Sequence, residues 1–156
     1  MENFLQYIFP TFVSNYDHIA LVLYDMFIPD QVLHVVDVDK MIKNMSKYNI
    51  QVMHPGIVGD TWESINNAEK EGLDHCICEV QFIETYVQVF TRDGCTCFYK
   101  MLHYSGSKGW CYDICFKSQC PEFRLGQDYS MLAYHMDRGV ANIPESEING
   151  TDLVEW

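Results

Sequence analysis

Residues 75–83 read His-Cys-Ile-Cys-Glu-Val-Gln-Phe-Ile, and at this point the hydrophobic pattern changes from helical spacing to a period of two. In an extended segment the even-numbered side chains from Cys76 to Phe82 share one face, and the odd-numbered ones from Ile77 to Ile83 share the other. Such alternation is typical of a β-strand. We therefore expect the sheet of this protein to begin here, with helices in the preceding part of the chain.

Further strands are expected after this one. Residues 86–91 lead into Asp93-Gly94, a dipeptide typical of a two-residue hairpin turn, because both central positions of that turn need a positive φ. Residues 95–102 would then return beside the preceding strand. After a loop of Ser, Gly and Lys at 105–109, residues 110–116 alternate again. The pattern predicts a three- or four-stranded antiparallel meander.

Helices are expected before the meander. Residues 4–12 carry apolar side chains at helical spacing, and residues 38–48 form an amphipathic helix with Asp37 as its N-cap. Residues 60–71 begin with a capping-box pattern and are also expected to be helical. Residues 17–28 are apolar on nearly every side, which fits either a buried helix or a central strand. That choice stays open.

The last part of the chain is expected to be helical and then irregular. Asp128 is positioned to cap a short helix that runs through Arg138, and residues 140–156 form an acidic tail that either docks through its apolar end or is disordered. The predicted fold class is α+β: N-terminal helices packed on the antiparallel meander, then a short C-terminal helix and the tail. Residues 1–139 are expected to form a single domain.

The chain is strongly acidic, with 22 Asp and Glu against 10 Lys and Arg and a formal net charge of -12. Residues 1–39 contain acidic side chains and no Lys or Arg, and the last eighteen residues repeat this pattern. Affinity for nucleic acid and for anionic membranes depends largely on Lys and Arg, so neither is an expected partner. A field of negative sign instead attracts basic proteins, although acidic surfaces also serve solubility alone.

The absence of a catalytic signature favours a binding protein over an enzyme. We expect a protein-interaction or inhibitor protein that occupies a basic site on another protein, in the way that immunity proteins and nucleic-acid mimics do. The residues expected to contact that partner are acidic and lie toward the two ends of the chain: Asp25, Asp30, Glu145, Glu147 and Asp152.

The sequence begins without the positive segment of a signal peptide and has no apolar run of membrane-spanning length, so a cytoplasmic protein is expected. Its seven cysteines are then expected to be reduced. If residues 95–116 formed a hairpin, four thiols could converge on a zinc ion: Cys95, Cys97, Cys115 and Cys120. Their spacing is unusual for zinc, and the simpler interpretation is that they pack in the core as small hydrophobic residues.

A small-ligand or enzymatic domain is the alternative function. Its pocket would lie between the sheet and the helices and would be lined by aromatic residues: Tyr86, Phe90, Trp110 and Tyr112. Cys120 paired with His103 or His135 could act as a nucleophile, but nothing in the sequence places these residues together. Asp37 and Asp39 could bind a divalent cation, yet helix capping explains both.

Overall fold

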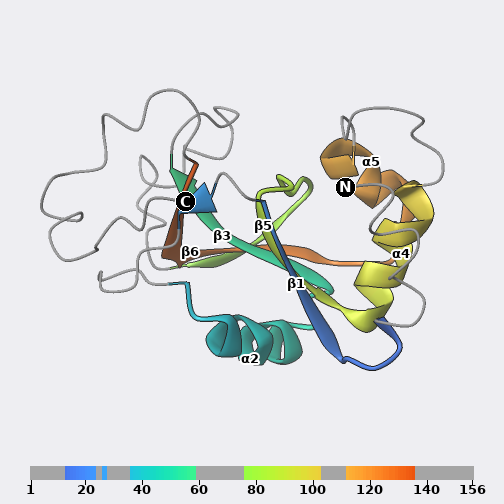
Figure 1. Ribbon diagram of the computed structural model, residues 1–156, viewed down its shortest axis with the longest axis horizontal. Helices are drawn as coiled ribbons and strands as arrows, with labels where there is room; N and C mark the ends of the chain where they lie inside the picture. The colour runs from blue at the N-terminus through green and yellow to red at the C-terminus, as the bar shows by residue number, and fades with distance from the viewer. Residues whose placement is uncertain (1–12, 24–25, 28–35, 59–75, 103–111, 136–156) are drawn as a thin grey trace, which may run out of the picture.

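A computed structural model describes residues 13–23, 26–27, 36–58, 76–102 and 112–135, which form one mixed sheet with helices packed against it (Figure 1). The strands are β1 (His18–Val22), β2 (Met26–Phe27), β3 (Val52–Val58), β4 (Ile77–Val80), β5 (Val87–Thr91) and β6 (Leu125–His135). The helices are α2 (Val38–Tyr48), α4 (Arg92–Leu102) and α5 (Tyr112–Gln119).

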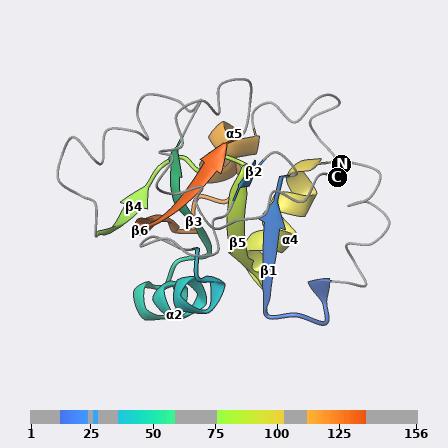
Figure 2. The same ribbon diagram turned by 60° about the vertical axis from the view of Figure 1, so that its left-hand side comes forward.

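The sheet is mixed, not an antiparallel meander. Its strand order is β1-β5-β3-β6-β2, and β4 also pairs with β6. Strands β3 and β6 are parallel, and the other pairs within the described residues are antiparallel. Figure 2 shows β4 alongside β6. The predicted arrangement of N-terminal helices on a meander is therefore wrong, because the central pair joins segments more than sixty residues apart in sequence.

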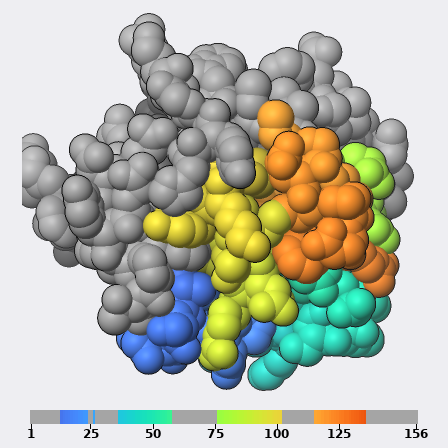
Figure 3. Space-filling view, turned by 90° about the vertical axis from the view of Figure 1, so that its right-hand side faces the viewer, coloured from blue at the N-terminus to red at the C-terminus, as the bar shows by residue number. Residues whose placement is uncertain are grey.

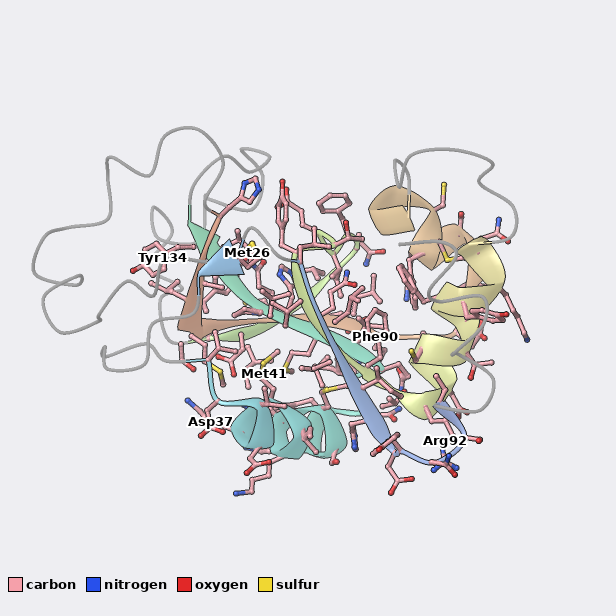
Figure 4. The ribbon with its side chains drawn as sticks, in the orientation of Figure 1. Met26, Asp37, Met41, Phe90, Arg92 and Tyr134 are labelled. Carbon is pink, nitrogen blue, oxygen red and sulfur yellow. A yellow bond between two sulfur atoms is a disulfide. The ribbon has the colours of Figure 1, made fainter. Side chains whose placement is uncertain are left out.

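The predicted helix with Asp37 as its N-cap is confirmed as α2. The Asp37 carboxylate accepts a hydrogen bond from the backbone N of Lys40 at 2.9 Å, and Asn49 ends the helix with a left-handed φ of 53°. Met41 and Met45 are buried and point from α2 toward the sheet, as the labelled Met41 shows in Figure 4. Burying each of these side chains contributes roughly 1.5–3 kcal/mol.

The expected turn at Asp93-Gly94 and the returning strand at 95–102 are wrong, because this segment is α4. The backbone N of Gly94 donates to Thr91 Oγ1 at 3.2 Å, so Thr91 closes the open N-terminus of the helix. The expected strand at 110–116 is also wrong where it is described, since α5 begins at Tyr112. Figure 3 shows α4 and α5 side by side on one surface of the molecule.

The expected helix from Asp128 to Arg138 is a strand as far as His135. Pro55 of β3 pairs with Asp128 while Gly56 pairs with Leu132, so β6 contains extra residues between these two positions. Such a bulge breaks the period of two and locally mimics helical spacing. Residues 18–22 and 26–27 are strands, which resolves the alternative left open for 17–28.

The sheet has an apolar core on each face. One row of side chains crosses the sheet in register and packs with α4 and α5: Ile19, Phe90, Val52, Leu125 and Val80. On the opposite face, Met53 and Val89 pack with the two buried methionines of α2. The helices therefore cover both faces of the sheet, with α2 on one side and the α4–α5 pair on the other.

Several expectations fall on residues that the structure does not describe. These are the helices at 4–12 and 60–71, the loop at 105–109 and the acidic tail at 140–156. Among the described helices, none combines the length and the apolar character needed to cross a membrane.

Candidate functional site

A row of polar side chains crosses the middle of the sheet beside the apolar row. Gln127 of β6 pairs in register with His54 of β3, and extending the β3–β5 register by one residue places His54 opposite Gln88. Leu21 of β1 and Cys78 of β4 continue the row at its two ends. Because side chains alternate along a strand, this row lies on the same face as Val52 and Phe90 and on the opposite face from α2. We call Gln88, His54 and Gln127 the polar row.

The polar row is buried. Relative exposure is 3% for Gln88, 0% for His54 and 1% for Gln127. Gln88 Nε2 donates to the carbonyl oxygen of Glu84 at 3.0 Å, which ties the row to the connection between β4 and β5. This connection also supplies Ile83 to the apolar core, so it lies over the same face of the sheet.

Several hydrogen-bonding atoms of the polar row lack partners within the described part of the chain. They are a ring nitrogen of His54, Oε1 of Gln88 and Nε2 of Gln127. A buried polar atom without a partner costs about 1–3 kcal/mol. Such atoms are rare in folded proteins and are an indication of function.

His54 is uncharged near neutral pH. Burial lowers the pKa of His54 to about 3, and a hydrogen bond from the imidazole to the Pro55 backbone carbonyl opposes this only in part. A neutral imidazole has one N–H donor and one nitrogen acceptor. Because the N–H of His54 is directed at the Pro55 carbonyl, the row offers His54 as an acceptor, Gln127 as a donor and Gln88 as an acceptor.

This row was not predicted from the sequence. Gln88 was expected on a strand, whereas residues 52–58 and Gln127 had no expected structure. A signal was present, because His54 and Gln88 each interrupt an apolar run. A polar residue within a buried strand is informative, whereas an exposed apolar one is common.

A second polar group joins α2 to the bulge of β6. The Asp128 carboxylate is fully buried and accepts hydrogen bonds from Asn44 Nδ2 at 3.0 Å and from the backbone N of Ser130 at 3.0 Å. Ser130 Oγ also donates to it at 2.5 Å, and Lys40 Nζ donates to Ser130 Oγ at 3.0 Å. Each oxygen of Asp128 has a partner, so the role of this hydrogen-bond network is structural: it holds α2 against the bulge of β6.

The four cysteines predicted to bind zinc lie on or beside α4 and α5. Cys97 of α4 forms a disulfide with Cys120, with 6.6 Å between their Cα atoms, which differs from the expected reduced state. Burial raises the pKa of Cys95 to about 12, and Cys115 is half-buried. Among the described residues, no group of three or more His, Cys, Asp or Glu is placed to hold a metal ion.

The predicted nucleophile and the predicted aromatic pocket have different surroundings from those expected. Cys120 is engaged in the disulfide. Phe90 is a core residue that packs on Phe98 with 5.2 Å between ring centroids, and Tyr86 packs on His135 at 4.4 Å. Trp110, His103 and the side chain of Tyr112 lie outside the described residues.

All five acidic residues predicted to contact a partner also lie outside the described residues: Asp25, Asp30, Glu145, Glu147 and Asp152. Comparisons of this chain with protein-family models, with curated proteins and with solved structures found no match. Its function is therefore inferred from its own residues.

Proposed function

We propose that this chain is an acidic binding or inhibitor protein that docks on a basic surface of a partner protein. The contact residues in this proposal are Asp25, Asp30, Glu145, Glu147 and Asp152. Their role is to steer the partner by charge, since complementary fields raise association rates more than they raise affinity.

The distribution of charge supports this proposal. The described residues include nine acidic and seven basic side chains, so the folded scaffold is nearly balanced. The remaining ranges contain thirteen of the 22 acidic residues and three of the 10 basic ones. Nearly all of the excess negative charge is thus carried by residues outside these described ranges, toward the two ends of the chain and in the segments between its elements.

The two arginines of the scaffold are engaged within the fold. Arg92 forms a salt bridge with Asp17 at 2.7 Å, and Arg124 forms one with Glu79 at 2.8 Å. Arg124 also donates to the carbonyl oxygen of Tyr48 at 2.6 Å, and its guanidinium lowers the pKa of the exposed Glu79. These cations already have acceptors in the scaffold, so they compete little with a basic partner for the acidic segments.

The test is the salt dependence of a purified complex. A basic protein retained from lysate at low salt would be identified and purified, and its association rate with the full chain measured at increasing ionic strength. Steered association falls steeply as salt screens the charges, with a Debye length of about 10 Å at 0.1 M. An association rate that does not change with salt would contradict the proposal.

A further inference from the structure

The polar row requires an explanation that the acidic surface does not provide. The neighbouring row on the same face and on the same strands is apolar throughout, so this fold can fill the face without polar groups. Gln88, His54 and Gln127 instead place unpartnered atoms at 3% exposure or less. Sequences keep costly groups of this kind mainly where they serve function.

We propose that the polar row is a binding site for a small uncharged molecule that carries both a hydrogen-bond donor and an acceptor, of the amide or alcohol class. The available groups match such a molecule. His54 and Gln88 Oε1 each supply an acceptor, and Gln127 Nε2 supplies a donor. None of the three side chains of the row carries a charge at neutral pH.

The spacing of the row favours a molecule larger than one water. Adjacent strands lie about 4.8 Å apart, so the row from β5 through β3 to β6 spans about 10 Å. A single water reaches partners within about 3 Å on each side and cannot serve all three side chains. One amide group with a short substituent can contact two strands at once.

Charged ligands fit the row less well. An ion that enters a buried site needs opposite charge and several hydrogen bonds to offset its desolvation. Glu84 is an acidic residue at 3% exposure, and its backbone carbonyl accepts the hydrogen bond from Gln88 Nε2. A cation held by Glu84 is therefore the alternative that the experiment must separate.

The experiment is a titration of the isotopically labelled full chain, followed by NMR of the His54 ring and of the side-chain amides of Gln88 and Gln127. Acetamide is the uncharged probe, and methylammonium and acetate are the charged probes of similar size. We expect saturable shifts of these three side chains with acetamide and none with either ion. Saturation by methylammonium instead, or no saturable shift with any probe, would overturn the proposal, the latter leaving water as the occupant.

Variants separate binding from folding. Gln127→Leu removes the donor from the row, and Met53→Leu changes a buried side chain on the opposite face of β3 with little change in volume. We expect at least a tenfold weaker acetamide response in Gln127→Leu and an unchanged response in Met53→Leu, both variants keeping the dispersed amide spectrum of the folded chain. An equal response in both variants would show that the shifts do not arise from the polar row.

Discussion

Gly94, in the first turn of α4, lies against the backbone of Gln51, the residue before β3. A Cβ atom added to Gly94 would stand 2.6 Å from the Gln51 carbonyl oxygen, which is too close for any side chain. That same carbonyl accepts the backbone N of Thr91 at 2.9 Å, so it cannot move away freely. This close approach fixes where α4 begins relative to the sheet.

Gly94→Ala should therefore destabilise the protein by about 1–3 kcal/mol, as overpacking does. Helix propensity alone predicts the opposite, a gain of about 1 kcal/mol. Urea unfolding measures the difference, with Lys100→Ala at an exposed position of the same helix as the control. A more stable Gly94→Ala protein would show that Gly94 is not in contact with Gln51.

The Cys97–Cys120 disulfide should protect both of its cysteines from alkylation. In denaturant without reductant, both cysteines should resist alkylation, and peptide mass spectrometry should recover their two segments joined. Cys97→Ser should lower the free energy of unfolding by about 3 kcal/mol, given the sequence separation of 23 residues. The loss should vanish when both proteins are compared in reductant. Full alkylation of Cys97 and Cys120 before reduction would contradict the pairing.

Stability should fall at acidic pH because of His54. In the unfolded chain His54 takes up a proton below about pH 6.5, whereas the folded protein resists protonation until about pH 3. The free energy of unfolding is therefore unaffected by His54 protonation above about pH 6.5, and it decreases as the pH falls from 6.5 toward 3. Between pH 6.5 and 5, wild type should lose about 2 kcal/mol more than His54→Leu. Parallel pH curves for the two proteins would contradict the burial of a neutral His54.

Removing either side chain of the Asn44–Asp128 hydrogen bond, which joins α2 to β6, should lower the free energy of unfolding. Asn44→Ala removes one donor to the buried Asp128 carboxylate and should cost about 1–2 kcal/mol, while Asp128→Ala leaves three donors without their acceptor and should cost about 2–3 kcal/mol. The double variant should lose less than the sum, because the two residues share one hydrogen bond. Ser46→Ala, at an exposed site of α2, is the control. Additive losses would show that Asn44 and Asp128 are not coupled.

Elements whose pattern lies within one short segment of the chain could be predicted from the sequence. Helix α2 has its cap, its apolar side and its end within thirteen residues, and strand β5 lies within the range expected for it. The strand at residues 77–80 also lies in the predicted alternating segment. For α2 the decisive interactions are made by neighbours in sequence, and for the two strands the local pattern indicates the strand but not its partner strands.

Elements that depend on contacts between residues far apart in the sequence could not be predicted. Asp93-Gly94 looks like a turn because glycine permits positive φ, but here glycine is needed for the close approach to Gln51, forty-three residues away. The bulge in β6 gave residues 128–136 an apparent helical spacing, and its cause is the pairing with β3. Gln88, His54 and Gln127 become neighbours only through that same strand order, so no local pattern joins them.

The most direct test of the proposed function compares two reversals of equal charge. Glu145→Lys/Glu147→Lys/Asp152→Lys changes the predicted contact residues, and Asp39→Lys/Asp93→Lys/Glu122→Lys changes exposed acidic residues of the scaffold. The measurement is the association rate of each variant with the purified basic partner at low salt. Reversal of the predicted contact residues should slow association at least tenfold, and reversal of the scaffold residues should slow it several times less. Equal rates for the two variants would contradict docking through these acidic residues.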